Sequence, residues 1–457
     1  MPRASSHAAR LAAPGQTPAA LAAVPPLAEL VGADVQVPLV TGGTTRYVNL
    51  DLAASAPALR PVADRVAELL PLYSSVHRGA GYASAVCTAA YEAARGEIAA
   101  FVGVRAEDVV QIVRNTTDAL NLLATAVPGP VVHLDVEHHA NLLPWQRIGG
   151  RVVSARATLA QTLEAVEAAI VESQAALLAV TGASNVTGEV LPIAQLASLA
   201  HAHGARIAVD GAQLVPHRRI DVAELEVDYL AFSGHKLYAP FGAGALIGHR
   251  DWLEAAPAYL AGGGAVRQVS VEGTSWAPVP ARHEAGTPNV IGAVALAAAC
   301  QTLAALPDGA LAAHETTLSE QLRQGLDAIP GVRVLALWPG EAERIGVVSF
   351  TVDGHPAELV AQYLSAEHGI GVRDGRFCAH PLLARLTGGA TAVRASLGVG
   401  SASGDVHRLV TAIAGLVADG PGWRYADAAG DYLPLDDPRA LPEWIAAAAL
   451  PGSPCGT

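Results

Sequence analysis

The sequence predicts an α/β protein, with a large domain built on a mostly parallel sheet and a smaller α+β domain after it. The first observation is that short β-rich runs alternate with helical stretches between residues 109 and 248. The second is that further strand-like runs, GVVSFTV, GIGVR and AVRASL, follow a long alanine-rich helix that begins near Val290. The third is size, because 457 residues with 51% hydrophobic content can bury more than one core.

In the large domain, the expected strands are VVQIV, PVVHLD, ALLAVTG, ARIAVD, DYLAFSG and GAGALIG, with helices between them such as residues 159–172 and 192–203. A hairpin is expected earlier, within residues 35–50, around Thr41-Gly42-Gly43.

We expect the chain to divide into four parts. They are an N-terminal extension (1–46), the large domain (47–289), a small C-terminal domain (290–418) to which the N-terminal segment can contribute, and a tail (419–457).

The charge and composition exclude several classes of function. The 42 acidic and 29 basic residues give a net charge of −13 without a basic cluster, which disfavours nucleic acid or an anionic membrane as partner. A small-molecule substrate is expected instead. The sequence has no apolar stretch long enough to span a membrane and no signal-peptide run in residues 1–26, so we expect a cytoplasmic location. The four cysteines form no CxxC pair, which argues against disulfides or a zinc site.

Lys236 is the only lysine in the chain, and the other 28 of the 29 Lys and Arg residues are arginine. Arginine can replace most surface lysines at little cost. It cannot replace an amine nucleophile, because guanidinium stays protonated and forms no Schiff base. The sequence therefore indicates that Lys236 acts as an amine nucleophile. The alternative is that this lysine survived by chance, and the residues around it must decide between the two.

Two expected strands end in polar residues that suit a pyridine cofactor. The strand ARIAVD ends in Asp210, whose carboxylate can keep a pyridine nitrogen protonated; a helix N-cap or a solvated turn is the alternative. The strand YLAF is followed by Ser233, His235 and Lys236, so that two side chains can donate to a phosphate while the lysine reaches an aldehyde carbon. Because ligands bind outside the carboxyl ends of parallel strands, we expect these residues to share one site.

Two further strand ends carry candidate ligand-binding groups. Thr116 and Thr117 follow VVQIV and open a helix, where hydroxyls and unpaired backbone amides bind phosphate; an ordinary threonine N-cap is the alternative. His138 follows VVHLD, and its imidazole can stack on a pyridine ring. A metal shared by His138 and His139 is disfavoured, because adjacent histidines point in different directions and no zinc spacing such as HExxH is present.

A series of longer motifs, in order from about residue 47 to 410, resembles the class V aminotransferase family of fold type I pyridoxal-phosphate enzymes, in particular its cysteine desulfurase and selenocysteine lyase branch. The motifs are YVNLDLAASAP, SSVHRG, YEAAR, NTTDALNLLA, VEHHANLLPWQ, SNVTGEVLPI, VDGAQLVPHRRIDV, DYLAFSGHKLYAPFGAGAL, EAGTPN, GVVSFTV, VRDGRFCAHPLL and VRASLG. This resemblance implies pyridoxal 5'-phosphate as the cofactor, no metal, a seven-stranded sheet in the large domain, and a homodimer.

Carried over residue by residue, the resemblance assigns ten residues to the cofactor. They are Lys236 as the Schiff-base amine, Asp210 at the pyridine nitrogen, His138 stacked on the ring, Gln213 and Asn185 near the phenolic oxygen, Thr116, Thr117, Ser233 and His235 at the phosphate, and Thr287 at the phosphate of the neighbouring subunit. Lys236 and His138 are also expected to take part in catalysis.

The substrate side has four candidate residues. Arg394, in VRASL, matches the arginine that binds the substrate α-carboxylate in this family; a surface or interface arginine is the alternative. Arg373 and Arg376, in VRDGRF, are further candidates for substrate contact. Cys378 falls where the desulfurase branch has its nucleophile, which takes sulfur from cysteine as a persulfide; a buried structural cysteine is the alternative.

The substrate side also departs from the pattern of that branch. The departures are Arg376 and Phe377 where two histidines usually precede the cysteine, Gly81 and Tyr82 where a histidine usually follows HRG, and Thr181-Gly182-Ala183 where Thr-His usually precedes SN. They suggest different chemistry or a bulkier substrate on an unchanged cofactor. Arg376 either lowers the pKa of Cys378 or binds a second carboxylate, and the sequence does not decide between these roles.

Three functions are open from the sequence. The first is a cysteine desulfurase that converts L-cysteine to L-alanine and passes sulfur through Cys378, with a sulfur-acceptor protein as partner. The second is a C–S lyase or aminotransferase acting on a specialised amino acid, for which Cys378 is not essential. The third is a noncatalytic partner or scaffold protein, which the full set of cofactor-facing residues disfavours.

Overall fold

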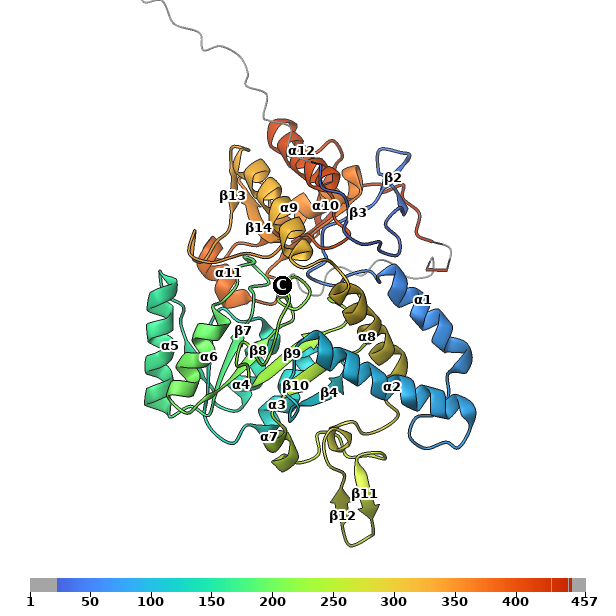
Figure 1. Ribbon diagram of the computed structural model, residues 1–457. Helices are drawn as coiled ribbons and strands as arrows, with labels where there is room; N and C mark the ends of the chain where they lie inside the picture. The colour runs from blue at the N-terminus through green and yellow to red at the C-terminus, as the bar shows by residue number, and fades with distance from the viewer. Residues whose placement is uncertain (1–22, 429, 443, 446–457) are drawn as a thin grey trace, which may run out of the picture.

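A seven-stranded sheet forms the centre of the large domain in the computed structural model, which describes residues 23–428, 430–442, 444 and 445 (Figure 1). In sheet order, the strands are β4 (Val109–Val113), β10 (Gly244–Gly248), β9 (Tyr229–Ser233), β8 (Arg206–Asp210), β7 (Leu177–Thr181), β5 (Val131–Leu134) and β6 (Arg151–Val153). Only β10 runs against its neighbours, β4 and β9, and the other pairs in this sheet are parallel. The predicted seven-stranded, mostly parallel sheet is confirmed.

Helices cover both faces of this sheet. One face packs against α1 (Arg60–Leu69), α2 (Tyr82–Phe101), α5 (Leu159–Ser173), α6 (Ile193–Ala202) and α8 (Val290–Ala304), and the other against α3 (Thr116–Ala126), α4 (Leu143–Arg147) and α7 (Arg250–Ala255).

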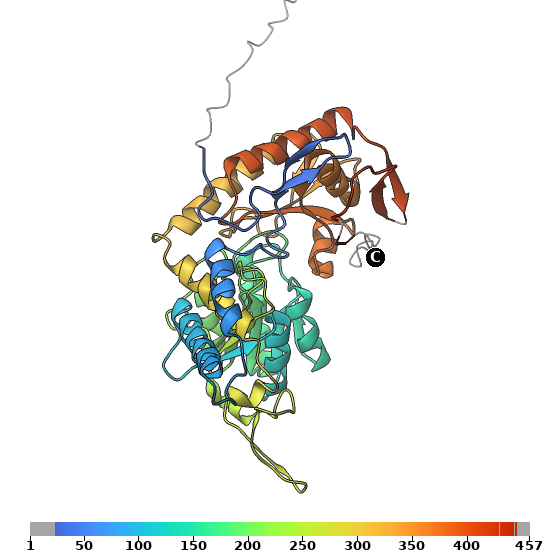
Figure 2. The same ribbon diagram turned by 90° about the vertical axis from the view of Figure 1, so that its right-hand side faces the viewer.

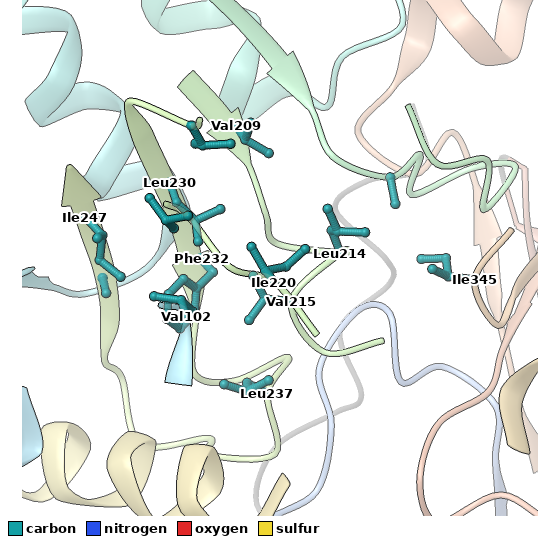
Figure 3. Close-up of a cluster of buried hydrophobic side chains, with 14 of the residues drawn as sticks. Val102, Val209, Leu214, Val215, Ile220, Leu230, Phe232, Leu237, Ile247 and Ile345 are labelled. Carbon is teal, nitrogen blue, oxygen red and sulfur yellow. The ribbon is translucent and has the colours of Figure 1, made fainter. Parts of the chain in front are cut away.

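Successive residues of a strand point to opposite faces of the sheet, so they pack alternately into the hydrophobic core on each face. In β9, Leu230 and Phe232 join the first core, whereas Tyr229 and Ala231 join the second. Figure 3 shows the first core around Phe232. Because both faces are covered, these strands are apolar almost throughout.

The small domain is an antiparallel sheet covered by helices, as the sequence predicts. Its strands, in sheet order, are β13 (Val332–Val334), β14 (Val347–Val352), β17 (Ala392–Ser396) and β16 (Arg373–Gly375). Its helices are α9 (Ala310–Asp327), α10 (Ala357–His368), α11 (His380–Thr387) and α12 (Ser403–Asp419). Figure 2 shows this domain above the large domain, with α9, α10 and α12 around the sheet.

Segments near both ends of the described chain attach to the small domain. The expected hairpin is present as β1 (Gln36–Pro38) and β2 (Thr44–Arg46), and β3 (Val48–Asn49) pairs in parallel with β15 (Ile370–Gly371). After α12, β18 (Tyr425–Ala428) and β19 (Asp431–Pro434) form a hairpin, and the Tyr425 hydroxyl donates to Glu367 of α10 at 2.9 Å. Parts of the expected N-terminal extension and of the tail lie outside the described residues. They are residues 1–22 and residues 446–457, the latter with Cys455.

The division between the two domains stays a prediction, and the packing of α8 bears on where it lies. Residues of α8 belong to the same core as α1 and α2 of the large domain. We therefore propose that the division follows α8 rather than residue 289. No helix among the described residues is long and apolar enough to cross a membrane.

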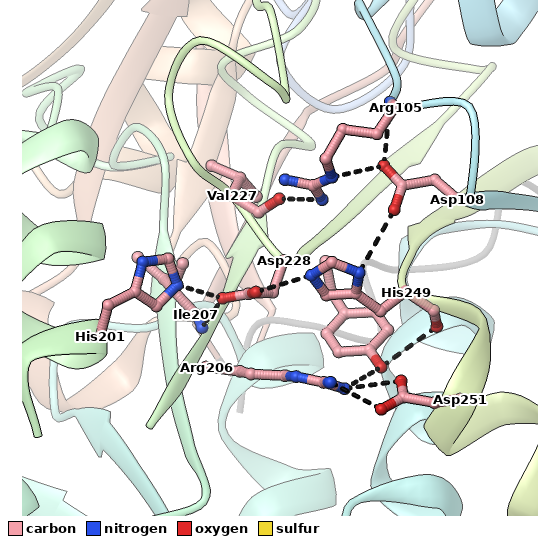
Figure 4. Close-up of polar contacts among 10 residues, drawn as sticks. Arg105, Asp108, His201, Arg206, Ile207, Val227, Asp228, His249 and Asp251 are labelled. Carbon is pink, nitrogen blue, oxygen red and sulfur yellow. Dashed lines mark hydrogen bonds and ion pairs between the residues drawn. The ribbon is translucent and has the colours of Figure 1, made fainter. Parts of the chain in front are cut away.

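A buried polar network fixes the amino ends of β8 and β9, at the opposite end of these strands from Asp210 and Ser233 (Figure 4). The Asp228 carboxylate is 5% exposed and accepts hydrogen bonds from His201 Nε2 (2.7 Å), the Ile207 amide (2.8 Å) and His249 Nε2 (3.0 Å). One carboxylate therefore ties α6, β8 and the segment after β10 together.

We expect Asp228→Ala to lower the free energy of unfolding by about 2–4 kcal/mol, because it leaves three donors without their acceptor. Urea unfolding of the purified variant measures the change. Asp251→Ala is the matched control in the same region, because its carboxylate is mostly exposed in its ion pair with Arg206 and should contribute less than about 1 kcal/mol. Equal losses in the two variants would contradict this role of Asp228.

Candidate functional site

The carboxyl ends of the parallel strands border a cavity of about 300 Å³ between the two domains. It brings together most of the residues that the sequence singles out. Those that line it are Thr116, Thr117, His138, Asn185, Asp210, Gln213, Ser233, His235, Lys236, Arg373, Cys378 and Arg394. Thr287 and Arg376 are exposed and do not line it.

Lys236 enters the cavity from the tight turn that follows β9. Removal of its amine from water is the main influence on its pKa, which falls to about 8 from the usual 10.5. Arg394 also lowers this pKa, whereas Asp210 and Cys378 oppose the shift. The amine is therefore more nucleophilic near neutral pH than that of an exposed lysine.

Asp210 is the last residue of β8, and its carboxylate is 3% exposed. Burial raises its pKa, against the opposing effects of the hydrogen bond from the Ala212 amide (2.9 Å) and of the Lys236 amine. A protonated ring nitrogen would give this buried carboxylate a cationic partner. Beside it, Gln213 Nε2 donates to the Ala53 carbonyl (2.8 Å), while its buried Oε1 has no partner among the described residues. These polar groups fit the pyridine cofactor that the sequence implies.

The other end of the cavity is built to hold an anion. The Ser233 hydroxyl, at the end of β9, accepts a hydrogen bond from the Thr116 amide (2.8 Å) and lies 2.7 Å from the Thr116 hydroxyl. Thr116 and Thr117 are the first two residues of α3, whose positive dipole end therefore faces the cavity. Burial lowers the pKa of His235 to about 4, so its neutral ring can donate one hydrogen bond to a phosphate.

His138 presents a neutral imidazole to the middle of the cavity. Burial, reinforced by Lys236 and by His139, lowers its pKa to about 3. Its Nδ1 accepts a hydrogen bond from the Ala140 amide (3.0 Å), which fixes the remaining proton on Nε2. A neutral ring of fixed orientation suits stacking on a heterocycle.

Arg394 of β17, which the sequence predicts to bind the substrate carboxylate, lines the cavity and is 3% exposed. Its Nη1 donates to the Asn185 carbonyl (3.1 Å) and its Nη2 to Asp51 Oδ1 (3.0 Å). The buried Nε has no hydrogen-bond partner among the described residues. The Phe377 ring lies against the guanidinium, 5.2 Å from the centroid to Cζ. The group is held rigidly and retains a donor for a carboxylate.

Cys378 lies in the loop between β16 and α11, in an unusual backbone conformation. Both Phe377 and Cys378 have φ of +53°, in the left-handed region that non-glycine residues rarely adopt. The loop is fixed from the large domain, because the Phe377 carbonyl accepts from Asn185 Nδ2 (2.7 Å) and the Cys378 carbonyl from the His139 amide (2.8 Å). Local strain of this kind is typical of functional sites, and here it accompanies a thiol at the cavity wall.

Two contributors to the site were not identified in the sequence. Asp51 lies within the motif YVNLDLAASAP and holds Arg394, and Phe377 packs on the same guanidinium. The available signal for the first was an acidic residue directly after the short alternating segment Val48-Asn49-Leu50. Phe377 is singled out in the sequence only as a departure from the desulfurase pattern, and nothing there predicts its packing on Arg394, because an aromatic residue in a loop is usually a packing residue.

We expect pyridoxal phosphate to be captured on Lys236 at a rate that rises with pH through about 8, because only the neutral amine attacks an aldehyde. Apoprotein is mixed with the cofactor at a series of pH values, reduced with borohydride at set times, and assayed for the adduct by mass spectrometry. An increase centred near pH 10 would contradict a depressed pKa for the amine.

Comparison with known proteins agrees with this geometry. The model of the aminotransferase class-V family matches residues 48–409. A cysteine desulfurase of Dickeya dadantii (strain 3937) is 39% identical over 383 residues, covering 80% of this chain and 90% of the relative. That of Klebsiella pneumoniae (strain 342) is 39% identical over 379 residues, covering 80% and 92%.

Solved structures give the same result. The apo cysteine desulfurase of Thermococcus onnurineus NA1 has a TM-score of 0.74 and 31% identity, covering 81% of this chain and 94% of that one. A cysteine desulfurase of Escherichia coli, in its S-sulfonic acid form, has a TM-score of 0.71 and 33% identity, covering 80% and 94%. The predicted family and fold are confirmed. The chain belongs to the aminotransferase class-V family.

Proposed function

We propose that this chain is a pyridoxal-phosphate-dependent cysteine desulfurase, which converts L-cysteine to L-alanine and receives the sulfur on Cys378 as a persulfide. The main support for this proposal is that one cavity of about 300 Å³ is lined by Lys236, Arg394 and Cys378. An amine for the cofactor, a guanidinium for the α-carboxylate and a thiol for sulfur are thereby within reach of one small amino acid. The names of the relatives support the same activity.

The cavity residues have separate tasks in this reaction. The bound cofactor withdraws electrons from the substrate α-carbon, which labilises bonds at that carbon and at the next. Arg394 binds the α-carboxylate and orients the side-chain sulfur. His138 would pack on the cofactor, and Asp210 would keep its ring nitrogen protonated. The Lys236 amine carries a proton to and from the substrate carbons, for which a pKa near 8 is well matched to neutral pH.

Sulfur transfer needs Cys378 as its thiolate. The thiolate attacks the substrate sulfur, the new S–S bond forms as the Cβ–S bond breaks, and the electron pair of that bond stays with the substrate carbon. Protonation of the carbon then yields alanine. The sum is one cysteine thiol plus L-cysteine giving one persulfide plus L-alanine, which is balanced in atoms and electrons.

A second cavity meets the first one at Cys378. Cys378 also lines an outer cavity of about 380 Å³, which shares Thr117, His138 and Ala140 with the inner one and opens beside Leu143, 53% exposed, and the exposed Arg147. We propose that a sulfur-acceptor protein brings its thiol to Cys378 from this side.

We also propose that the protein is a homodimer in which Thr287 reaches the cofactor phosphate of the partner subunit. The loop with Thr287 is tied to the base of a hairpin, β11 (Val266–Val269) and β12 (Thr274–Trp276), because the Gly286 amide donates to the Gly263 carbonyl (2.8 Å). The hairpin projects from the large domain (Figures 1 and 2), and Val271 at its turn is 99% exposed. Such exposed apolar side chains suit a subunit interface.

We expect Cys378→Ala to lose persulfide and alanine formation together, because no other thiol lies at the cavity wall among the described residues. Cofactor-loaded protein is incubated with L-cysteine and a reductant, and both alanine and sulfide are quantified. Cys300→Ala is the matched control, because burial in α8 raises the pKa of its thiol and should make it inert. Alanine formation that survives in Cys378→Ala would favour a C–S lyase or aminotransferase instead.

The shared site predicts complementation between two inactive variants. Lys236→Ala removes the amine, and Thr287→Asp places a negative charge where the partner's phosphate is expected. Heterodimers of the two, isolated by different affinity tags, should regain about half of the wild-type activity, because one of their two sites is intact. Heterodimers that stay inactive, or a Thr287→Asp protein with normal activity, would overturn the shared site.

A further inference from the structure

Two imidazoles that have no part in the reaction described above lie beside Cys378. His139 is half-buried and lines the outer cavity together with Cys378. Its ring contacts that of His380 edge to face, with 4.5 Å between the ring centroids and 71° between the ring planes. His380 is the first residue of α11 and is exposed, so the pair leads from the wall of the outer cavity to solvent.

This histidine pair is tied to the loop that carries the thiol. The His139 amide donates to the Cys378 carbonyl (2.8 Å), and His380 follows Cys378 by two residues. On the other side of the cysteine, Arg376 and Phe377 occupy the positions where the desulfurase branch usually has two histidines. Neither of these side chains can accept a proton near neutral pH. The imidazoles beside Cys378 on the outer side are therefore His139 and His380.

His139 is suited to accept a proton near neutral pH. Burial, reinforced by the nearby His380, lowers the pKa of its imidazole, so the ring is neutral at pH 7. The other ionisable groups beside it are His138, whose ring centroid is 6.3 Å away, Cys378, and Arg147 of α4 on the wall of the same cavity. The described part of the chain places no carboxylate on that wall, so nothing there holds the ring in its protonated form.

Transfer of sulfur out of the protein needs such a base. An acceptor thiolate attacks the outer sulfur of the persulfide, a new S–S bond forms, and the old S–S bond breaks with its electron pair on the Cys378 sulfur. A free thiol, with a pKa of about 8.5, is mostly protonated at pH 7 and must lose its proton as it attacks. The sum is one acceptor thiol plus the Cys378 persulfide giving one acceptor persulfide plus the Cys378 thiol, which is balanced in atoms and electrons.

We propose that His139 takes the proton from an acceptor thiol that enters the outer cavity, and passes it to the Cys378 sulfur released in the transfer. His380 is the positioning residue that holds the His139 ring. The inference rests on the proposed desulfurase function. It concerns the acceptor side of Cys378, whereas Lys236 and His138 act on the cofactor side.

The test measures the transfer step alone. Cofactor-loaded protein is loaded with sulfur from radiolabelled L-cysteine, freed from excess label by gel filtration, and mixed at pH 7 with one of two small thiols. One is 2-mercaptoethanol, which is almost fully protonated at this pH, and the other is 2,2,2-trifluoroethanethiol, which is of similar size but much more acidic. Release of label from the protein gives the rate for each loaded site. All proteins carry Cys455→Ala, because Cys87 and Cys300 are buried and the released label then reports on Cys378.

His139→Gln should slow transfer to 2-mercaptoethanol by about tenfold or more, because that thiol must lose its proton during the attack. Transfer to trifluoroethanethiol should slow by less than about threefold, because much of this thiol is already ionised. His380→Phe keeps a ring against His139 and should keep both wild-type rates, whereas His380→Ala should slow transfer to 2-mercaptoethanol by about threefold or more. His203→Gln is the matched control, because it removes another partly exposed imidazole, paired with Glu167, and should change neither rate.

Equal slowing with both thiols in His139→Gln would overturn the proposal, and so would unchanged transfer to 2-mercaptoethanol. If His139→Gln does not fold, His380→Ala and His380→Phe decide by the same comparison.

Failure of the proposed function has a different signature. If wild type takes up no label from L-cysteine, the desulfurase function fails. The role of His139 is then decided on Cys378 converted to a mixed disulfide with cysteamine, from which the same two thiols release cysteamine. The dependence of His139→Gln on thiol acidity should be the same in that reaction, and its absence would overturn the proposal.

Discussion

The alignment of strand ends in the central sheet is the constraint on which the site depends. Because β5, β7, β8 and β9 run in the same direction, their carboxyl ends meet at one edge. Asp210 and Ser233 are the last residues of β8 and β9, and Lys236 follows three residues later. The ends of β8 and β9 and the start of α3 thus line the same cavity.

Burial at this edge sets the chemistry of the groups. It depresses the pKa values of Lys236 and His138 and raises that of Asp210. Near pH 7 the imidazole is therefore neutral, and the amine loses its proton far more readily than that of an exposed lysine. The small domain completes the cavity with Arg394 and the strained loop at Cys378. The residues predicted to bind the cofactor therefore come from the large domain and those predicted to contact the substrate from the small domain, as expected for an unchanged electron sink with an altered substrate end.

Much of the fold and of the cofactor side could be predicted from the sequence. Apolar runs that end in a polar residue identify strand ends, and the strand topology then places Asp210, Ser233 and Lys236 together. Asp51 could not be placed, because its contact with Arg394 depends on how the segment before α1 packs on β17, far along the chain. Arg376 was a candidate from its neighbours in sequence alone, and the left-handed turn at Phe377 and Cys378 leaves it exposed outside the cavity. Thr287 is likewise outside, and its role depends on a second subunit that one sequence cannot position.

We propose that the amine of Lys236 holds the cofactor, and because Lys236 is the only lysine in the chain, this assignment can be tested directly. The protein is loaded with pyridoxal phosphate, reduced with borohydride, digested and analysed by mass spectrometry. We expect one pyridoxyl-phosphate adduct, on the peptide with Ser233-Gly234-His235-Lys236, and none in Lys236→Arg. Absence of the adduct from this peptide in well-folded wild-type protein would contradict the assignment of Lys236.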